Sequence, residues 1–303
     1  MDRLDAMRMF VRVAELGSFS AVAQQQGVAR SVVTRQVAAL EAHLGAKLMV
    51  RSTRRLALTS AGTAYLEKCR VILNLVESAE TDVAEERAIA HGHIRIGLPL
   101  SFGLKRLAPV LLEFAEAHPQ VSLEMDYTDR RVDLVEEGFD LSIRITSRLG
   151  PADVVRKLGS CRMMAVASPA YLARHGTPRR PSELVGHECL GYTGDANRGA
   201  WPFTLGDRIE TVYVQSRLTA NNGDVLADAA VRGLGITLQP DFIVEPYLAD
   251  GRLQRILDEF APPELGVYAR LPGTRYLPYR VRVLIDFLSE RLRPALAPVV
   301  APR

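Results

Sequence analysis

The clearest pattern in the chain lies in residues 28–45, where apolar side chains recur every three or four positions. The apolar set consists of Val33, Val37, Leu40 and Leu44. Spacings of four, three and four residues place this set on one face of an α-helix, turned toward a core. Ser31, Thr34 and Arg35 fall outside the stripe, near the start of the helix. The pattern therefore predicts a helix that buries one side and presents hydroxyls and an arginine on another.

The preceding residues predict two more helices. Apolar positions between Leu4 and Glu15 again follow a helical period, at Met7, Phe10, Val11 and Ala14. Gly17 is expected to end this first helix, Ser20 to cap the second, and Gly27 to close it. A helix, a short turn and a second helix with a polar leading face make a helix-turn-helix, whose second helix enters the major groove of DNA N-terminus first.

Two short strands, Leu48–Val50 and Leu56–Leu58, are expected next, with the sequence RSTRR as the turn between them. A hairpin with three arginines beside a recognition helix is a wing, suited to phosphates or to the minor groove. The alternative is a helical packing module with an arginine-rich surface turn. The wing and the charge of this region favour DNA binding.

A long helix is predicted from Ser60 to about Ile89, a stretch without proline. Its apolar positions are spaced alternately by four and three residues: Tyr65, Cys69, Ile72, Val76, Ala79 and Val83. This spacing is typical of a two-helix coiled coil and predicts a dimer. The alternative is a helix packed on its own domain, but the strongly polar flanks favour pairing. Cys69 is interpreted as a core residue rather than a redox switch.

From about residue 91 onward, strand and helix patterns alternate, which predicts α/β lobes with a mostly parallel sheet covered by helices. The expected helices are Leu104–Ala117, Val132–Glu136, Asp224–Arg232 and about Pro278–Leu292. About 210 residues of this pattern fit two lobes better than one.

Ligands of such sheets bind beyond the carboxyl ends of the strands, where helix N-termini converge. Applied to this chain, that rule selects Ser101, Phe102, Thr128, Arg144, Thr146 and Asn221 as candidate effector-binding residues. Hydroxyls, an amide and an arginine predict a small anionic ligand. Two alternatives stay open: loop tips are polar in any protein, and Arg144 could simply pair with an acid such as Asp140.

Composition and charge narrow the function. Up to Tyr65 the chain has nine basic and four acidic side chains, a charge of +5, which leaves −2 for the rest of a chain whose total is +3. A basic N-terminal part joined to a slightly acidic body is the layout of a nucleic-acid binder with a regulatory domain. No apolar run approaches the ~20 residues of a membrane span, and the charged N-terminus does not fit a signal peptide. We therefore expect a cytoplasmic protein with no membrane partner.

The sequence offers no sign of a catalytic or metal site. It has no GxSxG, no P-loop and no metal-spaced His/Cys cluster, and His91 and His93 have no third ligand nearby. The three cysteines, Cys69, Cys161 and Cys189, are far apart and are expected to be reduced thiols. We predict no catalytic residues, no metal and no cofactor beyond a small-molecule effector.

Residues 10–62, from FVRVAELG to LALTSAG, resemble the winged helix-turn-helix of LysR-type transcriptional regulators along essentially their whole length, with LEAHLGAKLMVRSTRRLALTSAG as the most distinctive part. The resemblance continues more diffusely in FDLSIRI, ASPAYLARHGTPRRPSEL and RGLGITLQP. It implies recognition-helix and wing positions, which in our prediction are Arg30, Ser31, Thr34, Arg35, Arg51, Thr53, Arg54 and Arg55. One departure is Ala29, where these proteins often have a serine at the start of the recognition helix.

The resemblance also implies the domain organisation. A winged helix-turn-helix domain would span 1–59, a linker and dimerisation helix 60–90, and a two-lobed, periplasmic-binding-protein-like (type 2) effector domain 91–303. Lobe I would comprise about 91–162 and 268–303 and lobe II about 163–267, with the chain crossing near Cys161–Met163 and returning near Tyr268–Leu271.

The function predicted from these features is a transcriptional regulator. Its predicted partners are a double-stranded DNA operator with an inverted repeat, a small anionic effector, a second copy of the chain and, by resemblance, a tetramer; RNA polymerase is a further candidate. An enzyme or a solute-binding transport protein on a two-lobed scaffold are the alternatives. The missing catalytic motifs disfavour the first, and the winged domain without an export signal disfavours the second.

Overall fold

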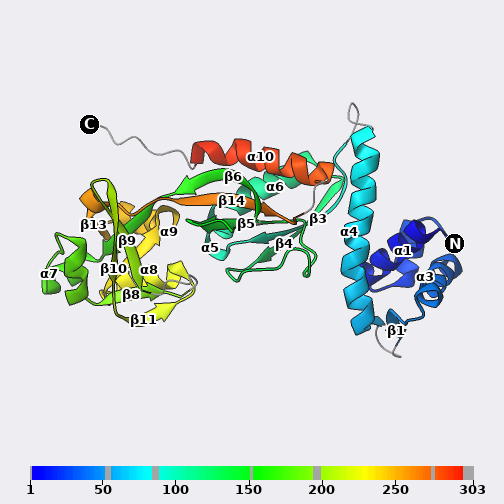
Figure 1. Ribbon diagram of the computed structural model, residues 1–303, viewed down its shortest axis with the longest axis horizontal. Coiled ribbons are helices and arrows are strands. Elements are labelled where there is room, and N and C mark those ends of the chain that lie inside the picture. The colour runs from blue at the N-terminus through cyan, green and yellow to red at the C-terminus, as the bar shows by residue number, and fades with distance from the viewer. Residues whose placement is uncertain are drawn as a thin grey trace. The chain divides into compact units, whose positions relative to one another are not determined.

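The computed structural model describes residues 2–51, 56–83, 89–150, 153–193, 199–273 and 277–295 (Figure 1). The backbone forms two compact units. The winged unit comprises Met1–Ile89 with Asp133–Gly138 and Thr274–Arg282; the two-lobed unit comprises Ala90–Val132, Phe139–Gly273 and Val283–Arg303.

The N-terminal segment of the winged unit, residues 1–89, contains four helices and a hairpin among its described residues: α1 (Arg3–Leu16), α2 (Phe19–Gln25), α3 (Arg30–Leu44), β1 (Met49–Arg51), β2 (Leu56–Leu58) and α4 (Ser60–Val83). Asp2 caps α1 by accepting hydrogen bonds from the amides of Leu4 and Asp5. Ser18, not the predicted Ser20, caps α2, because its Oγ accepts from the amide of Ala21 at 3.2 Å.

The core of the winged unit unites α1, α2 and α3 with the first half of α4. Phe10, Val33 and Leu40 are fully buried in it, and so is Cys69 of α4. The ring of Tyr65, also on α4, lies 5.9 Å from the ring of Phe10 between centroids. The first turns of α4 therefore pack on their own domain.

The first lobe of the two-lobed unit is built on a five-stranded sheet in the order β4-β3-β5-β14-β6. Its strands are β3 (Gly92–Leu98), β4 (Val121–Tyr127), β5 (Leu141–Thr146), β6 (Val154–Cys161) and β14 (Leu265–Leu271). The strands β4, β3 and β5 are parallel, while β14 runs antiparallel to β5 and β6. The helical segments are α5 (Leu100–Phe102), the π-helical turn η1 (Gly103–Leu107), α6 (Ala108–Ala117) and α10 (Tyr279–Ala295).

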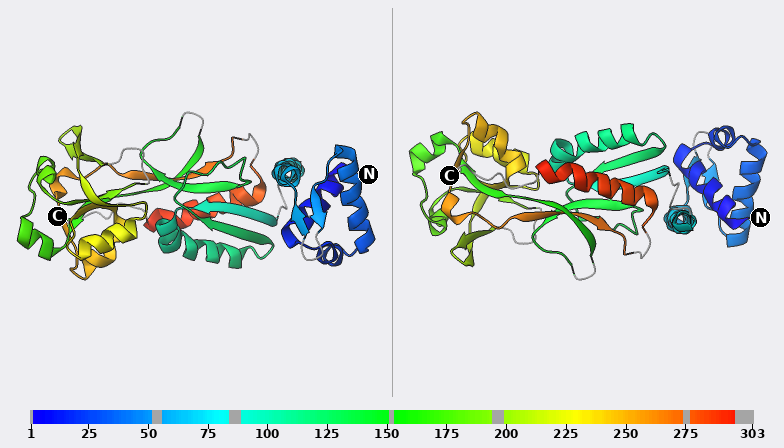
Figure 2. Two further views of the ribbon diagram at one scale, coloured as in Figure 1. Left: turned by 90° about the horizontal axis from the view of Figure 1, so that it is seen from below. Right: turned by 90° about the horizontal axis from the view of Figure 1, so that it is seen from above.

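The helices α6 and α10 lie side by side over this sheet (Figure 2), and Phe114 packs edge-on against Phe287 at 5.4 Å between ring centroids. The loops that follow the carboxyl ends of the parallel strands β3, β4 and β5 carry the polar residues considered below.

The second lobe has a five-stranded sheet in the order β11-β8-β12-β7-β13 and a separate hairpin of β9 and β10. Its strands are β7 (Met163–Ala167), β8 (Cys189–Tyr192), β9 (Ala200–Leu205), β10 (Arg208–Tyr213), β11 (Ser216–Ala220), β12 (Ile236–Pro240) and β13 (Gln254–Ile256). Its helical segments are α7 (Pro169–His175), η2 (Pro181–Gly186), α8 (Gly223–Val231), α9 (Asp241–Ala249) and η3 (Asp258–Phe260).

Several sequence-based expectations differ from the structure. The predicted helix Val132–Glu136 is a turn, and the helix predicted from Leu104 begins earlier, at Leu100, and passes through a π-helical turn. Both large sheets contain antiparallel as well as parallel pairs. The strand β14 already joins the first sheet at Leu265, so the chain returns to the first lobe before the predicted Tyr268.

No helix within the described ranges is both long enough and apolar enough to cross a membrane.

Candidate nucleic-acid interface and effector site

The exposed side of α3 holds the four predicted recognition-helix residues together. Arg30, Ser31 and Arg35 are exposed and Thr34 is half-buried. With Ala38 they line a shallow, open depression of about 410 Å³. Two guanidinium groups and two hydroxyls around one depression are donors suited to phosphate oxygens and base edges.

The opposite side of α3 explains why this face points outward. Val33, Val37 and Leu40 are buried as predicted, but Leu44 is 38% exposed. The fourth buried position is instead Glu41. The helix ends at Gly45 in the left-handed conformation (φ 63°), so Leu44 lies beyond the last turn that the core covers.

Glu41 connects α3 to the start of the wing. Its carboxylate accepts hydrogen bonds from the Lys47 ammonium (2.6 Å) and from the amides of Leu48 (2.9 Å) and Met49 (3.2 Å). Burial raises the pKa of Glu41, but the ammonium and the two amides lower it more, so the pKa lies below its usual value. The sequence analysis missed this residue, because a charged side chain in a helix is ordinarily assigned to the surface.

The N-terminus of α3 has no side-chain cap. Ala29 occupies the capping position with extended backbone (ψ 141°), and no side-chain oxygen there accepts from the first turn. Ala29 has no side-chain oxygen, and Ser31 does not supply the missing cap. The Val32 amide donates to the Ala29 carbonyl at 2.9 Å. The amides of Arg30 and Ser31, at the positive end of the helix dipole, point the way an external anion would approach.

The wing is described only at its base. Arg51 is the last residue of β1 and pairs with Leu56 of β2. Thr53, Arg54 and Arg55 lie outside the described residues.

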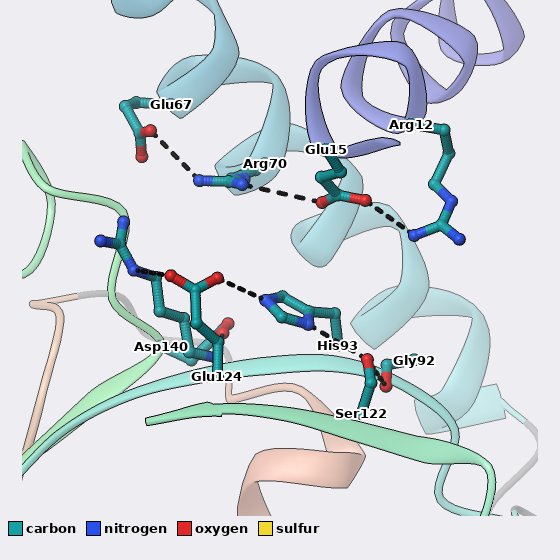
Figure 3. A network of polar contacts seen from close by, with 10 residues as sticks. Arg12, Glu15, Glu67, Arg70, Gly92, His93, Ser122, Glu124 and Asp140 are labelled. Carbon is teal, nitrogen blue, oxygen red and sulfur yellow. Dashed lines mark hydrogen bonds and ion pairs between the residues drawn. The ribbon is translucent and has the colours of Figure 1, made fainter. Parts of the chain in front are cut away.

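A chain of ion pairs fixes α4 to α1 (Figure 3). Arg12 contacts Glu15 at 2.7 Å, and Glu15 contacts Arg70 of α4 at 3.7 Å. Arg70 also contacts Glu67 at 3.2 Å, within α4. Arg12 donates a further hydrogen bond to Gln25 of α2 at 2.7 Å. Together with the core contacts, these pairs make the first half of α4 part of the winged unit.

The structure divides the predicted dimer seam. Tyr65 and Cys69 pack into the core of their own domain, which is the alternative that the sequence left open for this helix. Ile72 and Leu75, farther along α4, are 37% and 38% exposed, and Val76 is half-buried. Ala79 and Val83 belong to α4, but their side chains lie outside the described residues.

The predicted effector residues Ser101 and Phe102 lie on α5, directly after the carboxyl end of β3. Ser101 donates a hydrogen bond from Oγ to Asp224 of the second lobe at 2.5 Å. Asn222 donates from its amide to Ser101 Oγ at 3.3 Å. Phe102 packs edge-on against Phe242 at 5.1 Å between ring centroids. Both residues are buried and both contact the other lobe.

Thr128 and Arg144 lie at the ends of the neighbouring strands. The Thr128 amide donates to the Leu98 carbonyl at 2.8 Å, and Asp129 accepts from the Leu100 amide at 3.0 Å. The loop after β4 is thereby attached beside Ser101. Thr128, Ser101 and the end of β5 thus lie along one edge of the sheet.

Arg144 is a mostly enclosed cation. It donates to the Arg130 carbonyl at 2.5 Å, while its Nε is buried without a hydrogen-bond partner among the described residues. Burial lowers the pKa of Arg144, and the nearby charge of Arg270 lowers it further. The proposed partner Asp140 accepts a hydrogen bond from the Arg95 amide at 2.8 Å. The charge of Asp129 acts in the opposite direction. A half-buried guanidinium group near several other cations favours a further anion as its neighbour.

The side chains of the other two candidates make no contact with this group among the interactions of the described residues. Thr146 exchanges hydrogen bonds with the backbone of Arg148, donating at 2.8 Å and accepting at 3.1 Å. Asn221 is exposed, and its neighbour Asn222 is the residue that caps α8, by accepting from the amides of Asp224 and Val225.

Two residues at this site were missed by the sequence analysis. Lys105, on η1, contacts Asp224 at 2.5 Å. Asp224 was predicted only as the start of a helix. A lysine and an aspartate separated by 119 positions give no periodic signal that would link them.

His93 belongs to a strand-pairing contact rather than to a cluster of ligands. It contacts Ser122 (3.1 Å) and Glu124 (3.2 Å) on β4, and Glu124 also contacts Arg95 (2.9 Å) (Figure 3). Within the described ranges, no group of three or more His, Cys, Asp or Glu side chains is arranged to hold a metal ion.

The three cysteines are free thiols and all are buried. Burial raises the pKa of Cys69 to about 11 and the pKa values of Cys161 and Cys189 to about 12. At neutral pH these thiols are therefore protonated and poorly nucleophilic.

Comparison with known families matches both parts of the chain. Residues 4–63 match the family model described as bacterial regulatory helix-turn-helix protein, lysR family. Residues 88–293 match the model described as LysR substrate binding domain.

Individual proteins match over nearly the whole length. The probable HTH-type transcriptional regulator LtrA of Klebsiella pneumoniae is 33% identical over 299 residues, covering 98% of this chain and 96% of that protein. The HTH-type transcriptional regulator CrgA of Neisseria meningitidis serogroup C is 33% identical over 289 residues, covering 95% and 96%. The solved structure of CrgA, a LysR-type transcriptional regulator from Neisseria meningitidis, superposes with a TM-score of 0.60 at 32% identity, covering 95% of this chain and 98% of that one. The predicted fold, a winged helix-turn-helix followed by a long helix and a two-lobed, periplasmic-binding-protein-like domain, is confirmed.

Proposed function

This chain belongs to the LysR family of bacterial transcriptional regulators, and from that membership we propose that it binds an inverted-repeat operator as a dimer, under the control of a small anionic metabolite. Regulators of this family bind DNA and small-molecule effectors and form oligomers. Its relatives are regulators rather than enzymes. The operator's symmetry, the dimer and the charge of the effector are our proposals.

The observation that supports operator binding is the exposed face of α3. Arg30, Ser31, Thr34 and Arg35 surround one depression, while the buried side of the helix fixes its orientation. The uncapped N-terminus adds backbone amides for a phosphate. Arg35 lies one turn into the helix, where side chains of a recognition helix reach base edges. We assign base reading to Arg35 and phosphate contacts to Arg30 and the wing.

The exposed apolar side chains of α4 support the dimer. Ile72 and Leu75 are more than a third exposed, although Tyr65 and Cys69 on the preceding turns are covered by the domain's own core. A second copy of α4 is the partner that would cover them, because apolar positions of matching period pair with one another. Two recognition helices related by a twofold axis require an inverted repeat in the DNA. A tetramer and contact with RNA polymerase stay predictions.

The strand ends of the first lobe support an anionic effector. Ser101, Thr128 and Arg144 lie along one edge of the sheet, and Arg144 has a buried Nε without a partner among the described residues. We propose that these residues contact the effector. Asn221 and Thr146 were predicted with them, and we now give those two positions a secondary role at the rim.

Replacing Arg35 by Ala tests the operator-binding proposal. If Arg35 donates to a guanine edge, the affinity for operator fragments selected from genomic DNA should fall by ~1–3 kcal/mol, with relaxed preference at one base pair of each half-site. The measurement is a fluorescence-anisotropy titration at fixed salt concentration.

The matched control is Arg8→Ala, which removes another exposed arginine, from α1 of the same domain. Operator affinity should then stay close to that of the wild type. An Arg35→Ala protein that folds and binds its operator with unchanged affinity would refute the base-reading role.

A further inference from the structure

The two lobes are joined by polar contacts from α5 and η1 of the first lobe to the start of α8 and the middle of α9. Ser101 and Lys105 of the first lobe both contact the carboxylate of Asp224, each at 2.5 Å, one on each oxygen. A separate pair joins Arg106 to Glu245 at 2.6 Å. The carboxylate of Asp224 is therefore enclosed by donors of the opposite lobe.

Asp224 is bound as a free carboxylate would be bound. The Ser101 hydroxyl and the Lys105 ammonium group both donate to its oxygens, and Asn222 of the second lobe donates to the Ser101 oxygen at 3.3 Å. Charge-assisted hydrogen bonds of this kind are the ordinary means by which proteins recognise small carboxylates. Ser101 is only 8% exposed, so the site is sheltered on the side of the first lobe.

The same contact is open to exchange. The side chains of Lys105 and Asp224 are each 35% exposed, so water and solutes reach both charges. Ion pairs at that exposure contribute little net stability, because solvent screens them and holding two side chains in place costs entropy. Asp224 can leave the site for water without stranding a buried charge.

The backbone of η1 brings Lys105 and Arg106 close to the second lobe. A methyl group on Gly103 would lie 2.9 Å from the ring of Tyr127, so η1 or the ring would have to move to admit a larger residue. A π-helical turn here places the consecutive residues Lys105 and Arg106 both against the second lobe. Such turns inside helices are often found at functional sites.

We propose that Ser101 and Lys105, with Asn222 holding the Ser101 hydroxyl, form a carboxylate-binding site that Asp224 occupies from within in the effector-free protein, and that a carboxylate group of the effector binds there by displacing Asp224. This inference rests on the proposed effector function and names the ligand class and its internal competitor. Effector binding then replaces a lobe-to-lobe contact by a ligand-mediated one. That exchange gives the two lobes two distinct arrangements for a ligand to select.

Formate binding to the full-length protein tests the proposal. In Asp224→Ala the internal carboxylate is gone and the space it leaves fits formate, so saturation-transfer NMR on the formate proton should show a roughly tenfold or greater gain in affinity over the wild type, in which few molecules present an empty site. Adding Lys105→Ala to that variant should abolish the gain. Sodium chloride at equal ionic strength should not compete.

The matched control is Asp228→Ala, on the next turn of α8. Asp228 also accepts a hydroxyl hydrogen bond, from Tyr247 at 2.7 Å, but within the second lobe. The Asp228→Ala protein should bind formate as weakly as the wild type. Equal formate affinity in the Asp224→Ala and Asp228→Ala proteins would overturn the proposal, and so would a gain that survives Lys105→Ala.

The same protein samples are titrated with operator DNA. Failure of the wild type to bind DNA contradicts the proposed regulatory function and leaves the formate result standing. Absence of the formate gain in protein that binds DNA contradicts only the internal-carboxylate site.

Discussion

At the scale of single residues, Glu41 shows how one buried charge fixes a DNA-binding surface. Its carboxylate joins α3 to the amides that start β1, so the recognition helix and the base of the wing are held by one side chain. Removing a partner from such a buried group leaves amides without an acceptor, which costs more than the net value of the bonds.

We predict that Glu41→Gln lowers the free energy of unfolding by about 1–3 kcal/mol at pH 7. The glutamine side chain has no charge, and its NH2 group stands in place of one carboxylate oxygen, so it cannot accept hydrogen bonds from both Lys47 and the two backbone amides. The pKa of the folded carboxyl is lowered below the ordinary value of 4.5. Its stabilisation is therefore fully present above about pH 4.5 and is lost as the pH falls through the lowered pKa. The difference between variant and wild type should shrink over that interval in urea denaturation series.

The control for Glu41 is Asp5→Asn, since Asp5 is exposed and contacts Arg8 at 3.4 Å. It should leave the pH dependence unchanged. A Glu41→Gln protein whose stability falls with acid in parallel with the wild type would contradict the assigned role.

Prediction of single residues from the sequence succeeded where burial follows a helical period. It failed where the hydrogen-bond partner of a side chain lies outside its own helix. Val33, Val37 and Leu40 were identified correctly by spacing. Leu44 was not, because the helix ends there. Glu41 was missed because the backbone amides that donate to its carboxylate lie seven and eight positions later in the chain.

At the scale of elements, the joint between α4 and the wing depends on one glycine. A methyl group on Gly62 would lie 1.9 Å from the carbonyl oxygen of Leu48, a backbone atom that cannot rotate away. The Thr59 amide donates to the same carbonyl at 3.0 Å. The first turn of α4 and the start of β1 are thus in direct backbone contact.

Gly62→Ala should therefore destabilise the winged unit by ~1–3 kcal/mol or more, because the helix or the strand must move to admit the methyl group. The measurement is the urea midpoint together with hydrogen exchange of the β1 amides. The same substitution at Gly186, where an added methyl meets no described atom within 4 Å, should be close to neutral. Equal midpoints for the two variants would show that the joint tolerates separation.

Elements with a long, regular pattern were predicted well, and short ones were not. The helices α1, α3 and α4 have enough turns for a period to stand out. The five residues Val132–Glu136 have little more than one turn, and they form a turn whose bonds include Asp133 accepting from the amides of Val135 and Glu136. The missed helix α9 contains Pro246, which hid its pattern.

At the scale of the whole molecule, the proposed dimer depends on apolar side chains that α4 leaves uncovered. Ile72→Glu should place a charge in the paired seam and give monomers or irregular aggregates in sedimentation velocity, since an unpaired charge in an apolar interface is strongly unfavourable. Lys68→Glu, which introduces the same side chain at an exposed polar position of the same helix and changes the charge by even more, should leave the dimer intact. A stable Ile72→Glu dimer would place the interface elsewhere.

The sequence predicted that there are two lobes, but not which residues of one lobe contact the other. Alternating strands and helices indicated two lobes, and the polar strand ends indicated the edge of the sheet where Ser101 and Thr128 lie. The contact of Lys105 with Asp224 was out of reach, because it joins different lobes over 119 positions and depends on a π-helical turn that has no sequence period.

The rigid joint at Gly62 also constrains the promoters that this regulator can control. With the first half of α4 built into the DNA-binding domain, each recognition helix turns only as far as its own α4 turns. For a dimer held through α4, the distance between the two half-sites is then set by the protein and not by a pliable tether. A gene would come under this regulator's control by acquiring both half-sites at one fixed interval, and the insertion of a few base pairs between them would remove it from the regulon even with every contacted base preserved.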